Sequence, residues 1–295
     1  MLAQKTLLRI GLWLVSAVGL AAQSGEVKLV GSDLLGASFK RAVQQFAEQN
    51  EIAVPVDLAG TRLGREGLRS SVSTVAILSA RDGEAIKEAG WVALPFAYCT
   101  LVVVAPRGLP VNQLDFSQLS AIYGSSEAST QLRWGEFGAL GEWRGRTILP
   151  KIVGPKVSIA HDLMRYTILR TPTFKSTVEE LPTTAQVLAK LKTNDGALGI
   201  LPNLPADNPE LKVLLLTRDT GGVAFGPTPE NVHTGDYPVR LPLYLVFQRA
   251  EAPNLSRVLK FLLSEDTAEA LKVDGIVPLP RSVRNQEVFD LETLR

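Results

Sequence analysis

Residues 27–60 read VKLVGSDLLGASFKRAVQQFAEQNEIAVPVDLAG, and this stretch decides the fold. Val27 to Val30 predicts a strand that ends at Gly31, and Ile52 to Leu58 predicts a second strand that ends before Gly60. Between the two strands, apolar residues recur at the spacing of one helical face, at Leu35, Phe39, Val43 and Phe46. A strand, a helix and a further strand in this order are typical of an open sheet with helices on its faces.

The alternation of strands and helices continues along the rest of the 295 residues. Further strands are predicted at residues 75–78, 92–94, 97–105, 147–153, 197–201 and 243–247. Further helices are predicted at residues 64–70, 82–89, 114–122, 158–169, 184–191, 256–263 and 265–273. A chain of this length favours two lobes over one core, and we predict an α/β protein in which each lobe is an open, mostly parallel sheet flanked by helices. The predicted lobes are lobe 1, from residues 24–103 and a return segment at 243–295, and lobe 2, from residues 104–242.

Residues 1–23 are predicted to be a secretory signal peptide. Lys5 and Arg9 precede an apolar run from Ile10 to Ala22, and small residues lead out of that run, which is the three-part pattern of such a peptide. The run is shorter than the roughly 20 residues that cross a bilayer comfortably. A membrane anchor or a buried first helix is the alternative interpretation. No Cys follows the run directly, which argues against a lipid anchor. Because a signal peptide directs a protein out of the cytoplasm, we predict a periplasmic protein.

The charge of the chain favours no large charged partner. Without Lys5 and Arg9 the formal charge changes from +1 to −1, so we expect neither nucleic acid nor an anionic membrane surface as a partner. Cys99 is the single cysteine and cannot form an intramolecular disulfide, so the core must hold the protein together. Cys99 itself is interpreted either as a reactive thiol or as a small buried apolar residue.

The sequence motifs of enzymes are absent. The two histidines, His161 and His233, are far apart in the sequence and form no His-x-x-x-His pair. The sequence also contains no G-x-S-x-G elbow, no P-loop and no G-x-G-x-x-G turn. We therefore expect no catalytic residues, no metal and no cofactor, and a hydrolase is a weaker alternative.

Four turns carry small hydroxyl-bearing or glycine residues where a strand ends or a helix starts. In open α/β sheets, ligands bind beyond the carboxyl ends of the strands, where helix N-termini point their N–H groups. Four such turns facing one cleft would bind an anion without a metal, because hydroxyls donate hydrogen bonds and arginines match an oxyanion. The alternative is that these residues are ordinary caps and turns. The candidate ligand residues are Ser32, Asp33, Thr61, Arg62, Ser79, Arg81, Ser158 and His161.

The order of motifs resembles a known family. The motifs are Gly31-Ser32, Gly60-Thr61-Arg62-Leu-Gly64, residues 75–81, residues 94–106, Leu119-Ser-Ala-Ile-Tyr-Gly124 before Trp134, Asp195-Gly-Ala-Leu-Gly-Ile200, Tyr237-Pro-Val-Arg-Leu-Pro-Leu-Tyr244, and Ser264-Glu265 before Gly275-Ile-Val-Pro278. Over nearly the whole chain after the signal peptide, this order is similar to the phosphate-binding proteins of ABC importers, which have the type II periplasmic-binding-protein fold. The resemblance implies a monomer that captures phosphate or a similar oxyanion between its lobes and passes it to a transporter permease.

The resemblance also implies roles for the candidate residues. The serines and Thr61 would donate hydroxyl hydrogen bonds, and Arg62 or Arg81, with His161, would offset the charge of the anion. Asp33 would accept the proton of hydrogen phosphate and repel sulfate, or else it would cap the helix that begins near Leu35. Arg81 could equally be a solvated or ion-paired surface residue, and His161 a plain helix residue.

The chain departs from the family pattern at two of these turns. Asp33-Leu34 stands where the family has Ser-Thr, and Ser158-Ile159-Ala160 stands where it has Ser-Gly-Thr, while Lys151 or Lys156 would replace an arginine. These departures motivate a second hypothesis, in which the scaffold has a degenerate ligand site and serves as an interaction protein of the cell envelope. That hypothesis predicts a cleft filled by Leu34, Ile159 or other apolar side chains.

Overall fold

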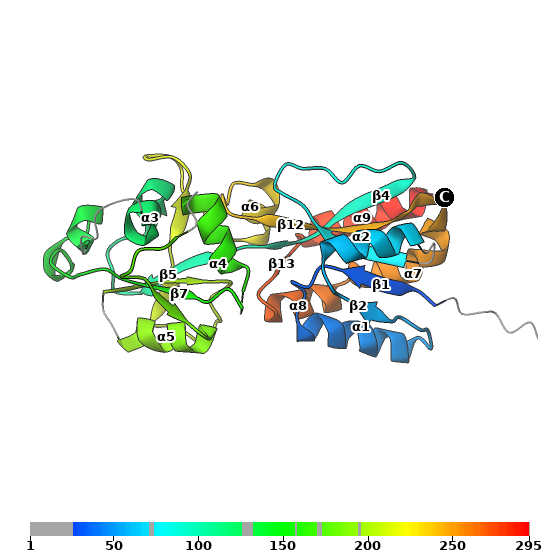
Figure 1. Cartoon of the computed structure of the whole chain (residues 1–295), viewed down its shortest axis with the longest axis horizontal. Helices are drawn as coiled ribbons and strands as arrows, with labels where there is room; N and C mark the ends of the chain where they lie inside the picture. Colours follow the sequence, from blue (N-terminus) through cyan, green and yellow to red (C-terminus); the bar gives the residue numbers. More distant parts are fainter. Residues whose placement is uncertain are drawn as a thin grey trace, which may run out of the picture.

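The computed structural model describes residues 26–70, 74–125, 132–156, 158–169, 173–193 and 196–294. The predicted signal peptide, residues 1–23, lies outside the described residues. Two lobes lie side by side along the long axis of the molecule, with the N-terminal and C-terminal elements together in one of them (Figure 1). No helix among the described residues is both long enough and apolar enough to cross a membrane.

Lobe 1 is built on a six-stranded sheet of order β13-β4-β12-β3-β1-β2. Its strands are β1 (Lys28–Gly31), β2 (Val56–Asp57), β3 (Thr74–Ser79), β4 (Trp91–Cys99), β12 (Leu241–Gln248) and β13 (Val277–Pro278). Strand β1 runs parallel to β2 and β3, whereas β12 runs antiparallel to β3 and β4. Its helices are α1 (Ala37–Gln49), α2 (Thr61–Ser70), α7 (Ala252–Leu262), α8 (Glu265–Val273) and α9 (Arg281–Thr293), with a 3₁₀ turn, η4 (Arg249–Glu251).

Both faces of the lobe 1 sheet are covered, which explains the unbroken apolar run in β3. Val75 and Ile77 join the large core that includes Phe39 of α1, while Ala76 and Leu78 join a smaller cluster with Leu68 of α2. Alternate side chains of a strand point to opposite faces, so a strand buried on both faces must be apolar throughout.

Lobe 2 is built on a five-stranded sheet of order β10-β5-β9-β7-β8, beside a small two-stranded sheet of β11 and β6. Its strands are β5 (Val102–Pro106), β6 (Gln113–Asp115), β7 (Leu149–Val153), β8 (Glu179–Leu181), β9 (Ala197–Leu201), β10 (Leu211–Val213) and β11 (Leu215–Thr217). Its helices are α3 (Phe116–Tyr123), α4 (Ala160–Leu163), α5 (Thr184–Thr193) and α6 (Pro229–Thr234), with a π-helix, η3 (Met164–Leu169), and 3₁₀ turns η1 (Trp134–Phe137) and η2 (Gly141–Trp143).

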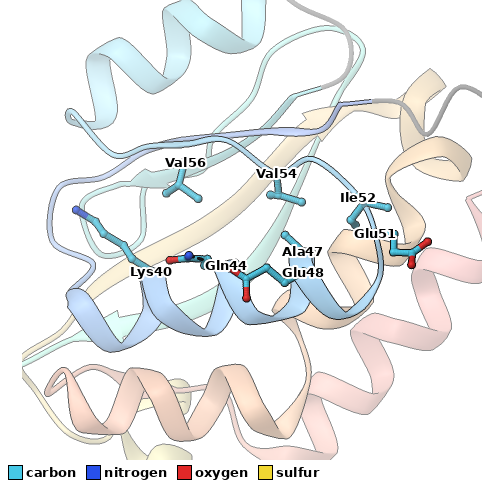
Figure 2. Close-up of a pocket in the computed structure, with 8 residues that line it drawn as sticks. All are labelled: Lys40, Gln44, Ala47, Glu48, Glu51, Ile52, Val54 and Val56. Carbon is cyan, nitrogen blue, oxygen red and sulfur yellow. Dashed lines mark hydrogen bonds between the residues drawn. The ribbon is translucent and has the colours of Figure 1, made fainter.

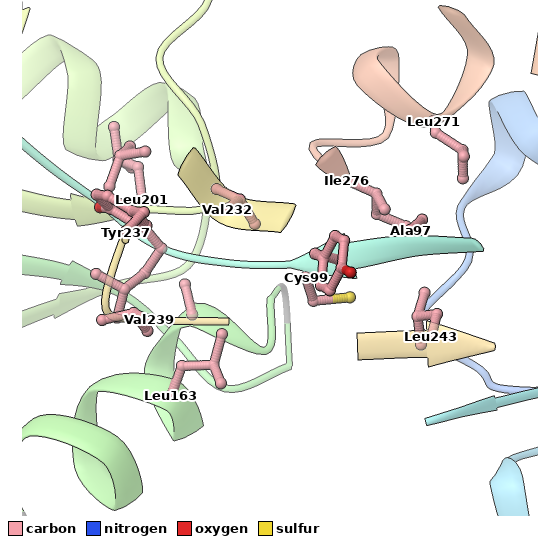
Figure 3. Close-up of a cluster of buried hydrophobic side chains, with 14 of the residues drawn as sticks. Ala97, Cys99, Leu163, Leu201, Val232, Tyr237, Val239, Leu243, Leu271 and Ile276 are labelled. Atoms are coloured by element: carbon pink, nitrogen blue, oxygen red, sulfur yellow. The ribbon is translucent and has the colours of Figure 1, made fainter. Parts of the chain in front are cut away.

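The two crossings between the lobes are bonded to each other. The chain leaves the lobe 1 sheet after β4 and returns to it at β12. Thr100 donates from Oγ1 to the carbonyl oxygen of Val239 at 2.5 Å, and the Tyr237 hydroxyl donates to the carbonyl oxygen of Leu101 at 2.7 Å. Buried apolar side chains, among them Cys99, continue from one lobe to the other along these crossings (Figure 3). The predicted lobe boundaries at 103/104 and 242/243 stay predictions.

The two-lobed α/β fold is confirmed, but three details of the prediction are wrong. Both sheets are mixed rather than mostly parallel, because β12 in lobe 1 and β5 in lobe 2 run antiparallel to their neighbours. Residues 82–89 form no helix, because a turn at residues 82–83 is followed by irregular chain up to a second turn that begins at residue 89. The strands predicted at residues 92–94 and 97–105 are not separated at Pro95, because β4 passes through Pro95 opposite Tyr244, beside a register shift in β12.

Candidate functional site

Two glycines, Gly31 and Gly64, allow the end of β1 to lie close to β3 and to helix α2. Gly31 ends β1 with a φ of +128°, and a Cβ there would lie 2.1 Å from the carbonyl oxygen of Ile77. A Cβ on Gly64 would lie 2.5 Å from the Cα of Gly31, so the spacing Gly60-x-x-x-Gly64 lets α2 approach the end of β1. Only glycine permits backbone contact this close.

This close approach pairs two predicted ligand residues. Thr61 begins α2 and Ser79 ends β3, and their hydroxyl oxygens lie 2.8 Å apart. The backbone N–H of Ser79 also donates to Oγ1 of Thr61 at 3.0 Å. Both side chains are only partly buried. The result is a fixed pair of hydroxyls where the carboxyl end of β3 meets the start of α2.

The turn after β1, at Gly31-Ser32-Asp33, differs from its sequence prediction. Ser32 is buried and accepts a hydrogen bond from the backbone N–H of Leu34 at 3.4 Å, so it holds the turn. Asp33 is exposed and does not cap α1, and the capping hypothesis for Asp33 is wrong. The apolar periodicity placed the start of the helix at Leu35, but α1 begins two residues later, at Ala37, and its N-cap is therefore Gly36.

The N-terminus of α1 is instead capped by a carboxylate from the far end of the chain. Asp274 accepts hydrogen bonds from the backbone N–H groups of Ser38 at 3.1 Å and Phe39 at 2.9 Å. A Cβ on Gly36 would lie 2.4 Å from the Asp274 Cγ, so glycine at this position makes room for the carboxylate. A carboxylate is favourable here because the first N–H groups of a helix have no partner within the helix.

A cavity of about 270 Å³ lies between the lobes and is lined from both of them. Lobe 1 contributes Asp33, Leu34 and Asp274, and lobe 2 contributes Lys156, Ser158 and Ile159. Thr100 and Cys99 line it from the crossing. Burial raises the pKa of the Cys99 thiol to about 12, which supports its interpretation as a buried apolar residue. We call this hollow the small interlobe cavity.

The two predicted ligand residues of lobe 2, Ser158 and His161, lie in different surroundings in the structure. Ser158 lines the small interlobe cavity and accepts a hydrogen bond from the backbone N–H of Ala160 at 3.1 Å. His161 is buried against the ring of Phe174 at a centroid distance of 5.0 Å, and its Nε2 lies 3.5 Å from Glu180. His161 therefore packs within lobe 2 and lines neither interlobe cavity.

The two predicted ligand arginines, Arg62 and Arg81, also lie in different surroundings. Arg62 is exposed and pairs with Glu66 at 2.7 Å, one turn along α2, so its charge is already balanced. Arg81 lines a second, larger interlobe cavity of about 730 Å³ that shares Ile159 with the small one. Within the described ranges, no three His, Cys, Asp or Glu side chains lie close enough together to hold a metal ion.

A third hollow lies away from all of these residues. It is an open groove of about 500 Å³ between α1 and the edge strand β2, and none of the predicted ligand residues lines it (Figure 2). Its lining mixes charges of both signs, with Lys40 at one end of the groove and Glu51 at the other. The interlobe cavities are therefore the candidate functional site.

Sequence reasoning missed Asp274, and it weighed Lys156 only as a substitute for an arginine. The partners of Asp274 lie 236 and 235 residues away along the chain, so no local pattern marks it as the cap of α1. The available signal was Gly36, because a glycine directly before a helix leaves the N-cap position without a side-chain acceptor.

Comparisons with known proteins agree with this geometry. No protein-family profile matches the chain. The phosphate-binding protein PstS of Pseudomonas aeruginosa is 21% identical over 285 residues, which cover 91% of this chain and 87% of that protein.

Solved structures extend the comparison to the fold. A possible phosphate-binding protein from Planctomyces limnophilus superposes with a TM-score of 0.67 at 19% identity, covering 92% of this chain and 98% of that one. PstS from Borrelia burgdorferi superposes with a TM-score of 0.64 at 16% identity, covering 86% of this chain and 98% of that one. A putative phosphate ABC transporter substrate-binding protein from Clostridium perfringens, with bound phosphate, gives 0.53 at 18% identity, covering 87% and 100%. The chain is therefore similar to phosphate-binding proteins of ABC transporters along most of its length, and it has their two-lobed α/β fold.

Proposed function

We propose that this protein is an exported solute-binding protein that captures phosphate or a similar oxyanion between its lobes and delivers it to an ABC importer. The observation that carries the proposal is the small interlobe cavity, in which polar side chains of opposite lobes, Asp33 and Ser158, face the same space. A ligand that bonds to both lobes favours the closed form of a hinged protein. The proposal describes a periplasmic binding protein and not an enzyme.

The chemistry of the cavity wall supports an oxyanion that carries a proton. Lys156 lines the cavity and brings a positive charge from lobe 2. The hydroxyl pair of Thr61 and Ser79 lies at the lobe 1 strand ends, outside the cavity lining, and we propose that it contacts the anion when the lobes close. Asp33 has no hydrogen-bond partner among the described residues, so its carboxylate is available to accept the proton of hydrogen phosphate. Sulfate has no proton to give at neutral pH, and the same carboxylate would repel it.

Calorimetric titration of the protein without residues 1–23 tests the proposal. Phosphate is expected to bind, and sulfate is expected to bind at least tenfold more weakly. Replacing Thr61 by Val is expected to weaken phosphate binding about tenfold, because one hydroxyl hydrogen bond to a charged group contributes on the order of 1.5 kcal/mol.

The controls separate lost binding from lost structure. Thr61→Ser keeps the hydroxyl and is expected to retain most of the affinity. Thr293→Val alters an exposed threonine of α9 and is expected to leave the titration unchanged. The proposal is abandoned if neither phosphate nor another oxyanion at millimolar concentration produces heat or shifts the melting temperature.

One observation favours the second hypothesis, an interaction protein of the envelope with a degenerate ligand site. Leu34 and Ile159 both line the small interlobe cavity, where the resemblance implies Thr and Gly. Asp274 also lines this cavity, and it already occupies the first N–H groups of α1. This hypothesis predicts no response to any small anion, so the same titration decides between the two.

A further inference from the structure

The larger interlobe cavity is a site of a different kind from the small one. Its volume of about 730 Å³ lies in the range of pockets that bind whole small molecules, roughly 300–1,000 Å³. Lobe 1 contributes Arg81 from the loop after β3. Lobe 2 contributes Tyr166 and Thr167 of η3 and Arg218 from the loop after β11. A ligand in this cavity would therefore contact both lobes.

The charges in this cavity leave two guanidinium groups available. Arg240 is already committed, because it pairs with Asp82 at 2.8 Å and donates to the carbonyl oxygen of Val232 at 2.8 Å. Arg81 and Arg218 both line the cavity and are exposed, and neither has a carboxylate within ion-pair distance among the residues that the structure describes. These two guanidinium groups come from opposite lobes, so a dianion bound between them would have each of its two negative charges neutralised by one arginine.

Arg218 is also held in place. Its guanidinium lies 5.6 Å from the ring centroid of Phe116, at the start of α3. An arginine packed on an aromatic face loses less conformational entropy when it binds a ligand. Phosphate oxygens match the planar fork of arginine in two hydrogen bonds, which a lysine cannot reproduce. The residue types therefore favour a phosphate group over a single negative charge.

The other wall of the cavity offers an aromatic surface. Tyr166 is 67% exposed although it is a large ring, and it lies on a π-helix, a rare element that is frequent at functional sites. The guanidinium of Arg165 lies 5.2 Å from the centroid of the Tyr166 ring, which supports the ring on one side. Asp162 and Thr167 add hydrogen-bonding groups beside it. Such a wall suits a ring that carries hydroxyls.

We propose that the larger interlobe cavity binds an organic phosphate, a phosphate monoester whose dianionic group lies between Arg81 and Arg218 and whose ring packs on Tyr166. Orthophosphate alone would fill a minor part of this space and has no ring to pack on Tyr166. The proposal goes beyond the capture of orthophosphate, because it concerns a cavity whose lining shares only Ile159 with the small one. Closure of the lobes on the ester would bring the two arginines onto the same phosphate.

Glucose 6-phosphate is the probe, with glucose and orthophosphate as comparators, all titrated into the protein without residues 1–23. The ester is expected to bind, and glucose is expected to produce no heat. Arg218→Ala is expected to weaken the ester at least tenfold and to leave any orthophosphate binding unchanged. Tyr166→Ala, at an exposed position where folding is not at risk, is expected to weaken the ester severalfold. Arg249→Ala, an exposed arginine elsewhere on lobe 1, is the matched control and should change neither titration.

The outcomes separate this inference from the proposed function. Ester binding that depends on Arg218 and Tyr166 supports the inference, whether or not orthophosphate binds. Orthophosphate binding with no response to the ester overturns the inference and leaves the proposed function standing. Ester binding that Thr61→Val removes and Arg218→Ala does not would also overturn it, because the phosphate group would then contact the hydroxyl pair of Thr61 and Ser79 and not Arg218.

Discussion

Replacing Gly31 by alanine is expected to lower the free energy of unfolding by about 4 kcal/mol, the largest effect of any single change considered for this protein. Two costs add at this position. The backbone has a φ of +128°, which L-residues rarely adopt, and the added Cβ would lie 2.1 Å from the Ile77 carbonyl oxygen. The strand end cannot move away, because Gly60 donates its backbone N–H to the Gly31 carbonyl oxygen at 2.7 Å. Urea unfolding followed by circular dichroism measures the loss.

Gly60 provides the matched control. Its φ of +120° is close to that of Gly31, but no atom lies within 4 Å of a Cβ built there. Gly60→Ala therefore carries the backbone cost without the steric cost, and it is expected to lose about 2 kcal/mol. If the two variants unfold at the same urea concentration, the close approach of β1 and β3 does not contribute to stability as argued.

Replacing Asp274 by alanine is expected to lower the free energy of unfolding by about 2 kcal/mol, because α1 loses both side-chain acceptors at its N-terminus. The same change is expected to strengthen phosphate binding severalfold, because a negative charge leaves the wall of the small interlobe cavity. Urea unfolding and calorimetric titration of one protein preparation measure the two effects.

Two further variants test the cause. Asp274→Asn keeps one acceptor oxygen without the charge, so it should recover about half of the stability and keep the gain in affinity. Asp57→Ala removes an exposed carboxylate of β2 and should alter unfolding by less than about 0.5 kcal/mol. Unchanged stability of Asp274→Ala would mean that solvent replaces the carboxylate at the helix terminus.

The elements that local patterns specify were predictable from the sequence. The helix of Phe39 and Val43 and the strand of Val75 to Leu78 both bury the residues that their periodicity indicated. The predicted helix at 82–89 failed because Ile86 is its one large apolar side chain, so it has no face to bury. The mixed sheets could not be predicted from periodicity, because strand direction depends on how the chain crosses between lobes.

The site was predictable only in part, for a related reason. Thr61 and Ser79 were found because each lies at the end or start of an element, where local sequence specifies position. Arg62 and His161 follow the same turns, but Glu66 pairs with the first and Phe174 packs against the second. The i,i+4 spacing of Arg62 and Glu66 was a local signal that the sequence reasoning did not use. Phe174 is 13 residues from His161, and the sequence near that turn does not specify their contact. Asp274 depends on contacts across almost the whole chain and was beyond any local pattern.

The continuity of lobe 2 along the chain has a consequence for the order of folding. All strands of its five-stranded sheet lie between Val102 and Val213, so this sheet can be completed from one uninterrupted segment. The lobe 1 sheet has β12 between β3 and β4, and this central strand begins only at Leu241. As the chain emerges from its N-terminus onward, lobe 2 can therefore mature first, while β1 and β3 wait with an exposed edge for β12. That waiting half-sheet is the species that a chaperone would need to shield before the protein reaches its native form.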